Sequence, residues 1–222
     1  MKILIVLAHP EIRSMNGAMF RQAIQALTAE GHEVKTSDLY REGFDPVSGR
    51  NNFQGACDPA YFKQQLEEVH AFRTAGFAED VEAEQQKVEW CDLMIWQFPL
   101  WWFAVPGILK GWVDRVFAMG RFYGDGRFYE TGVFQGKKAL LSLTTGSAEE
   151  RYLRDGLQGD LYGILKPVHR GILRFVGFDV LRPQVVYGPA RLSEAQRELE
   201  LGRWSERLKG VFSEQAMEVG RY

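Results

Sequence analysis

The chain has 222 residues, of which 45% are hydrophobic and 25% are charged, the composition of an ordinary globular protein. This length suits one domain over 1–222 that buries its core without disulfides or metals. The net charge of −2, with no Lys/Arg block, argues against nucleic acid as a partner. The N-terminus lacks the features of a signal peptide, and the longest apolar run, 100–109, is too short to span a bilayer. We therefore expect a cytoplasmic protein.

Two cysteines, Cys57 and Cys91, lie far apart without the spacing of metal ligands. We expect both to be buried thiols of a protein from a reducing compartment.

Strand-like and helix-like segments alternate along the chain. The apolar run 2–8 is typical of a strand buried on both faces, and an amphipathic helix is predicted over 17–29. The remaining predicted elements are strands at 33–39, 92–97, 137–143 and 179–187, helices at 58–69, 80–89, 106–117, 159–176 and 193–209, and a loop over 40–55. This alternation predicts an α/β fold, a doubly wound parallel five-stranded sheet with helices on both faces. Ligands of such sheets bind beyond the carboxyl ends of the strands, which singles out the loops 9–16, 98–106 and 144–152.

The first loop brings His9, Ser14 and Asn16 to the start of a helix and lacks the glycine fingerprint of dinucleotide-binding Rossmann domains. Free backbone N–H groups and the helix dipole make such a position receptive to phosphate. The alternative is that Ser14 or Asn16 is only an N-cap of the helix.

The second loop places two indoles and a phenyl ring, Trp101, Trp102 and Phe103, directly after a buried strand. At the carboxyl end of a sheet, such rings can form the floor and wall of a site for a planar ring. They can equally cover the core or a subunit interface.

The third loop begins with the small and hydroxyl-bearing residues 144–147, and Tyr152 follows it. Gly146 allows close approach of a ligand, and the hydroxyls can pair with the polar edge of a heterocycle. An ordinary turn and a structural tyrosine are the alternatives. Taken together, the three loops offer the phosphate donors, the stacking surface and the polar edge that a flavin nucleotide needs.

Several long segments resemble the NAD(P)H:quinone reductases, or DT-diaphorases, and the related dihydronicotinamide-riboside:quinone reductases. The segments that carry this resemblance are SDLY (37–40), AEQQKVEWCDLMIWQFPLWWFAVPGILKGWVDRVF (83–117), GKKALLSLTTG (136–146) and GILRFVGFDVL (171–181). The resemblance implies a flavodoxin-like fold and a homodimer with active sites at its interface. It also implies tightly held FAD rather than FMN, and ping-pong hydride transfer from NAD(P)H through the flavin N5 to quinone-like acceptors.

The resemblance also implies roles for individual residues. Contacts with FAD are expected from His9, Ser14, Met15, Asn16, Ala18, Pro99, Leu100, Trp101, Trp102, Phe103, Thr144, Thr145, Gly146, Ser147, Tyr152 and Arg197. The acceptor is expected against Trp102, Phe103, Phe175 and Tyr123, with Tyr123 coming from the other subunit. Tyr152 and Gln158 fall on the catalytic positions, where Tyr152 donates to the charge that develops near the flavin N1 and C2 oxygen.

The sequence departs from the family pattern at three places. Gln158 stands where the family has an active-site histidine, and an amide does not titrate near neutral pH. Ser147 replaces a glycine and is followed by a charged rim. Arg170 and Arg174 replace the histidines of a metal site found in some members, so we expect no metal.

Three other functions remain open from the sequence. They are an FMN-dependent azo or nitro reductase of the same superfamily, a flavin-bearing regulatory subunit of an ion-efflux system, and a flavodoxin-like electron carrier. The lack of a basic or amphipathic membrane-facing stretch argues against the regulatory subunit. The aromatic loop and Tyr152 argue against the carrier.

Overall fold

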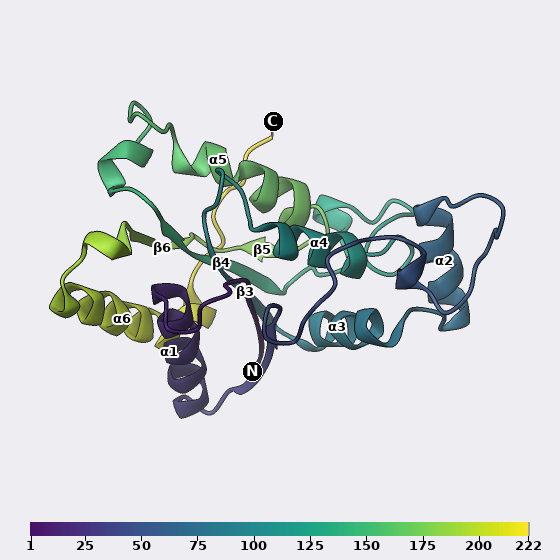
Figure 1. Ribbon diagram of the computed structural model, residues 1–222, viewed down its shortest axis with the longest axis horizontal. Coiled ribbons are helices and arrows are strands. Elements are labelled where there is room, and N and C mark those ends of the chain that lie inside the picture. The colour runs from purple at the N-terminus through teal and green to yellow at the C-terminus, as the bar shows by residue number, and fades with distance from the viewer. Residues whose placement is uncertain (222) are drawn as a thin grey trace.

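A six-stranded parallel sheet forms the centre of the computed structural model, which describes residues 1–221 (Figure 1). The strands β1 (Lys2–Leu7), β2 (Glu33–Asp38), β3 (Leu93–Pro99) and β4 (Lys138–Thr145) lie in the order β2-β1-β3-β4. The short strands β5 (Asp179–Val180) and β6 (Gln184–Tyr187) pair with the beginning and the end of β4. They share the fifth position of the sheet, so the predicted parallel five-stranded arrangement is confirmed with its last strand interrupted.

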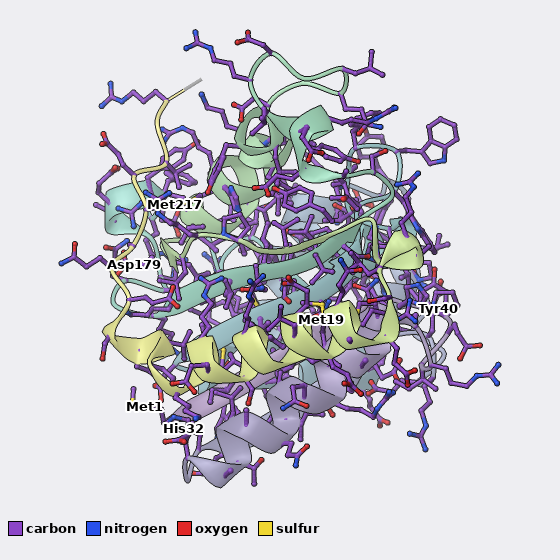
Figure 2. The ribbon with its side chains drawn as sticks, turned by 90° about the vertical axis from the view of Figure 1, so that its left-hand side faces the viewer. Met1, Met19, His32, Tyr40, Asp179 and Met217 are labelled. Carbon is purple, nitrogen blue, oxygen red and sulfur yellow. The ribbon has the colours of Figure 1, made fainter. Side chains whose placement is uncertain are left out.

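Helices cover both faces of this sheet. The helices α1 (Met15–Ala29) and α6 (Glu194–Lys209) pack together on one face, which Figure 2 views. The helices α3 (Glu79–Trp90), α4 (Gly107–Val116) and α5 (Leu161–Val168) pack on the other face, and α2 (Gln64–Thr74) lies away from the strands (Figure 1). The fold is therefore doubly wound, as the alternation of elements predicts.

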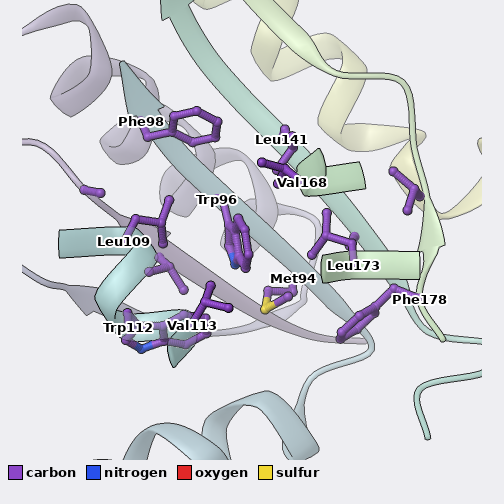
Figure 3. Close-up of a cluster of buried hydrophobic side chains, with 14 of the residues drawn as sticks. Met94, Trp96, Phe98, Leu109, Trp112, Val113, Leu141, Val168, Leu173 and Phe178 are labelled. Atoms are coloured by element: carbon purple, nitrogen blue, oxygen red, sulfur yellow. The ribbon is translucent and has the colours of Figure 1, made fainter. Parts of the chain in front are cut away.

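Alternate side chains of each central strand enter two separate hydrophobic cores. Ile3, Ile5 and Leu7 of β1 pack with α1 and α6, whereas Leu4 and Val6 face the opposite core. In that second core, shown in Figure 3, the side chains of β3 lie against those of α4, α5 and the segment after α5; they include Met94, Trp96, Phe98, Leu109, Trp112, Val113, Val168 and Leu173. Full burial of each such side chain contributes about 1.5–3 kcal/mol, so both faces of the sheet are strongly fixed.

The helix predicted over 58–69 is wrong at its start, because α2 begins only at Gln64. The Asp58 side chain accepts hydrogen bonds from the backbone N–H groups of Ala60 and Tyr61, a turn that competes with a helix. The carboxylate of Glu67 accepts from the N–H groups of Cys57 and Asp58 and holds this turn against α2.

Two predicted elements are interrupted at proline residues. The helix predicted over 159–176 is α5 followed by a π-helical segment, His169–Arg174, because Pro167 lacks the N–H that an α-helix needs. The strand predicted over 179–187 divides into β5 and β6 on either side of Arg182-Pro183.

The expectation of two buried thiols is wrong for one of them, since Cys91 is buried but Cys57 is exposed. Cys57 lies in the turn before α2, where its backbone N–H donates to the Glu67 carboxylate. This contact fixes the backbone and leaves the thiol at the surface. Among residues 1–221, no helix has the length and apolar character needed to cross a membrane.

His169 opens the π-helical segment and is 1% exposed. Its Nε2 has no hydrogen-bond partner within the described residues, and burial lowers the pKa of the imidazole to about 4. Asp160, Lys166 and Glu218 line the same small hollow. The folded protein therefore holds His169 in its neutral form.

We expect this histidine to make folding sensitive to acid. Because its pKa is lower folded than unfolded, its contribution is complete above about pH 6.5 and is lost as the pH falls toward 4. Urea unfolding at pH 7 and pH 4.5 should show that His169→Gln loses about 2 kcal/mol less stability than the wild type across this interval. Equal losses in the two proteins would contradict this role.

Candidate functional site

A cleft of about 480 Å³ opens at the N-terminus of α1, beside the carboxyl ends of β1 and β4. The winding of the sheet reverses between β1 and β3, which is where ligands of such sheets bind. The lining residues come from the β1–α1 loop, the end of β4, and the segment leading into α6: His9, Arg13, Ser14, Met15, Asn16, Thr144, Pro189, Ala190 and Arg197. Six of the predicted site residues therefore meet in one cleft, namely His9, Ser14, Met15, Asn16, Thr144 and Arg197.

A buried chain of polar side chains forms one wall of this cleft. The Gln97 Nε2 donates to the Asn16 Oδ1, and the Asn16 Nδ2 donates to the Thr144 Oγ1, each at 2.8 Å. All three residues are at most 5% exposed. Because the Thr144 oxygen accepts the amide hydrogen, its own O–H remains available as a donor.

The sequence patterns do not predict the contribution of Gln97. Its signal is a single amide in the otherwise apolar strand LMIWQFP (93–99). A buried polar side chain in a central strand needs a partner, which could have pointed to this residue.

Ser14 is the N-cap of α1, since its Oγ accepts from the Gly17 N–H at 3.2 Å. The cap interpretation is thus confirmed for Ser14 and is wrong for Asn16, which lies inside α1 and belongs to the polar chain. A side chain at Gly17 would collide with the backbone of Ile12, so a glycine is needed where the loop folds back on the helix.

His9 is held in one orientation by its Nδ1, which accepts from the Glu11 N–H at 3.0 Å and lies 3.2 Å from the Ser14 Oγ. Burial lowers the pKa of His9, although the neighbouring Glu11 acts in the opposite direction. The neutral ring therefore carries its proton on Nε2, where it can donate to a ligand. Together with the free N–H groups of α1, this donor suits a phosphate.

The loop after β3 is a tight turn with strained geometry. Trp101 and Ala104 exchange both backbone hydrogen bonds, and the two residues between them have positive φ, 51° for Trp102 and 59° for Phe103. Left-handed backbone costs roughly 1–2 kcal/mol per residue other than glycine. Trp102 is 96% exposed, and the Trp101 ring lies 6.0 Å from that of His9. This strained turn therefore presents aromatic rings next to the cleft.

A second group of hydroxyls lies at the end of β4 and in the loop after it. The Thr145 Oγ1 donates to the Ser147 carbonyl at 2.7 Å, and the Gln158 Nε2 donates to the Ser147 Oγ at 3.2 Å. Burial raises the pKa of Tyr152, with a hydrogen bond to the Thr145 side chain acting the other way. The phenol of Tyr152, which is 7% exposed, therefore remains protonated at neutral pH.

Other predicted site residues lie apart from the lining of this cleft. Tyr123 and Phe175 contact each other, with ring centroids 5.6 Å apart, and line a different hollow of about 310 Å³ with Glu68. The end of β3 contributes Pro99, and Leu100 follows it with its N–H bound to the Thr144 carbonyl. Ala18 lies one turn into α1.

Arg170 and Arg174, which replace the histidines of the metal site found in some family members, have other contacts. Arg174 pairs with Asp179 at 3.2 Å, and the Arg170 guanidinium lies 4.4 Å from the centre of the Tyr129 ring. Within the described part of the chain, no cluster of three or more His, Cys, Asp or Glu residues is arranged to hold a metal ion.

The residues present fit a flavin nucleotide. The cleft offers neutral donors and a helix N-terminus for phosphate, while the turn at Trp102 offers aromatic surface. The space in which a side chain at Gly146 would lie is open, and the buried Oε1 of Gln158 still lacks a donor among residues 1–221. A ring with both carbonyl and N–H groups on its edge matches this set.

Comparisons with known proteins agree with this chemistry. A family model described as a flavodoxin-like fold matches residues 1–208. The chain is 43% identical to the rat (Rattus norvegicus) ribosyldihydronicotinamide dehydrogenase (quinone), over 96% of this chain and 93% of that protein. It is 44% identical to NAD(P)H dehydrogenase (quinone) 1 of Cavia porcellus, over 96% and 78% of the two chains.

Among solved structures, a candidate quinone reductase from Klebsiella pneumoniae superposes with a TM-score of 0.94 at 37% identity, covering 97% of this chain and 86% of the other.

We predict that the polar chain at the cleft wall stabilises the fold. Replacing Gln97 by Leu leaves the Asn16 Oδ1 buried without its donor, so the free energy of unfolding should fall by about 1–3 kcal/mol. Urea unfolding measures the change. Gln86→Leu, at an exposed glutamine of α3, is the control and should change stability by less than about 0.5 kcal/mol. A Gln97→Leu protein as stable as the control would contradict the prediction.

Proposed function

Because the chain belongs to the quinone reductase family with the flavodoxin-like fold, we propose that it is a flavin-dependent NAD(P)H:quinone oxidoreductase. The proposed reaction is a ping-pong transfer of two electrons, as hydride, from NAD(P)H to a quinone-like acceptor. The observation that carries the proposal is the meeting of a phosphate-receptive helix start, an exposed aromatic turn and a hydroxyl-rich strand end at one edge of the sheet.

We infer that the flavin is FAD. The cleft continues past the N-terminus of α1 to Pro189, Ala190 and Arg197. A mononucleotide such as FMN would leave this part of the cleft empty. The guanidinium of Arg197 is held in place by the Leu192 carbonyl at 2.6 Å. When bound, the flavin supplies the hydride chemistry that no side chain of the protein provides.

The protein's own part is to bind, orient and stabilise charge. His9, the Thr144 hydroxyl and the first N–H groups of α1 would hold the phosphates. Trp102 and Phe103 would cover the reacting ring and keep water from it. The protonated phenol of Tyr152 would donate to negative charge that develops at the polar edge on reduction.

We infer that the active form is a homodimer with its sites at the interface. Tyr123 and Phe175 line a hollow separate from the cleft of their own chain, so a role for them beside the acceptor needs a second copy. The nearly complete exposure of Trp102 in one chain also favours an arrangement in which a partner covers this ring.

Steady-state kinetics test the proposed reaction. Initial rates measured over a grid of NADH and benzoquinone concentrations should give parallel lines in double-reciprocal plots, as expected when one substrate leaves before the other binds. A dye with an azo bond, used as the alternative acceptor, should be reduced more slowly. Intersecting lines would contradict ping-pong transfer, and a preference for the azo dye would contradict the assignment of the acceptor.

A second prediction concerns Gln158. Since its amide has no proton to gain or lose near neutral pH, the rate of reduction by NADH should change little with pH between 6 and 8. Gln158→His should introduce a pH dependence centred near the imidazole pKa of about 6.5. Stopped-flow measurement of flavin bleaching across this range gives both profiles. Superimposable profiles would show that position 158 does not influence the step.

A further inference from the structure

Ser147 and Gln158 form a pair at the polar edge of the candidate site. They lie at the two ends of a loop, and the Gln158 Nε2 donates to the Ser147 Oγ at 3.2 Å. The Gln158 backbone N–H also donates to the Arg151 carbonyl at 2.9 Å, which fixes this end of the loop. The amide is therefore held toward the hydroxyl by the fold of the loop itself.

The direction of this hydrogen bond decides what the hydroxyl can do. An oxygen that accepts an amide hydrogen keeps its own O–H for another acceptor. Within the described residues, no second hydrogen bond of the Ser147 hydroxyl is present, and the Ser147 carbonyl is already bonded by Thr145. The same arrangement occurs at Thr144, whose oxygen accepts from the Asn16 amide. Two hydroxyls near the end of β4 are thus set as donors by neighbouring amides.

We propose that Ser147 donates a hydrogen bond to a carbonyl oxygen on the edge of the bound heterocycle, and that Gln158 is the positioning residue that holds its hydroxyl in the donating direction. The inference rests on the proposed function, because it assumes a flavin or a quinone at this edge. Both ligands present carbonyl oxygens, so either one can accept a hydrogen bond from the Ser147 hydroxyl.

Gln158→Glu gives the sharpest test, because it keeps the shape of the side chain and replaces the amide that donates to Ser147 with a carboxylate that accepts. Above the pKa of the new carboxyl, a carboxylate can only accept, so the Ser147 O–H would turn toward it and be lost to the ligand. The expected effect is about a tenfold loss, the size of one hydrogen bond to an uncharged acceptor. Ser147→Ala should give a loss of the same size.

Two readouts distinguish the ligands. The dissociation constant of FAD, measured by flavin fluorescence, rises about tenfold in both variants if the acceptor is a carbonyl of the flavin. If the acceptor is instead the quinone, FAD binding is unchanged and the KM for benzoquinone rises. Either shift supports a donating Ser147, provided that the double variant Ser147→Ala/Gln158→Glu is no worse than either single variant.

The pH dependence separates positioning from a structural role. Protonation of the new carboxyl restores a donor, so the defect of Gln158→Glu should shrink at pH 4.5 to 5, whereas that of Ser147→Ala should not. Gln25→Glu, at an exposed position of α1, controls for the added negative charge.

Three results would overturn the inference. Gln158→Glu could match the wild type in both readouts, the two single losses could add in the double variant, or Ser147→Ala could have no effect. A wild-type protein that takes up no flavin would instead refute the proposed function.

Discussion

The chain of hydrogen bonds from Gln97 through Asn16 to Thr144 is the interaction on which the candidate site depends. It joins β3, α1 and β4 beneath the cleft, at the point where the winding of the sheet reverses. Burying polar groups is unfavourable unless they are hydrogen-bonded, so the Gln97 Nε2, the two polar atoms of the Asn16 amide and the Thr144 hydroxyl hold one another in place. The Gln97 Oε1 is buried without a partner among residues 1–221. The start of α1 and the end of β4 are held together in consequence, and the Thr144 hydroxyl is left free to donate into the cleft that it lines.

Rigid support of this kind allows strain to persist nearby. The turn between β3 and α4 holds two bulky residues in the left-handed region, and the reciprocal hydrogen bonds of Trp101 and Ala104 keep it closed. Strained backbone of this type is concentrated at functional sites, where it presents side chains that relaxed geometry would turn away. An exposed indole next to a cleft receptive to phosphate is consistent with a site completed by a planar ligand and a partner subunit.

Much of the fold and of the site could be predicted from sequence. The apolar runs identified the central strands, and the rule for doubly wound sheets located the three loops. His9 and Asn16 of the first loop and Thr144 of the third converge in one cleft. Sequence patterns missed what depends on single local interactions. The Asp58 turn moves the start of α2 to Gln64, Pro167 and Pro183 interrupt the later elements, and Gln97 is paired only through residues distant in the chain. Whether Ser14 caps the helix or contacts phosphate likewise required the geometry of its hydroxyl.

The proposed function requires this protein to bind a flavin that accepts hydride from a nicotinamide. An anaerobic absorbance spectrum, recorded before and after one equivalent of NADH with chromatography of the cofactor released on denaturation, tests it most directly. We expect a flavin band that bleaches directly to the two-electron reduced form, and FAD as the released species. A bound flavin that NADH fails to reduce, or a protein that takes up no flavin, would contradict it.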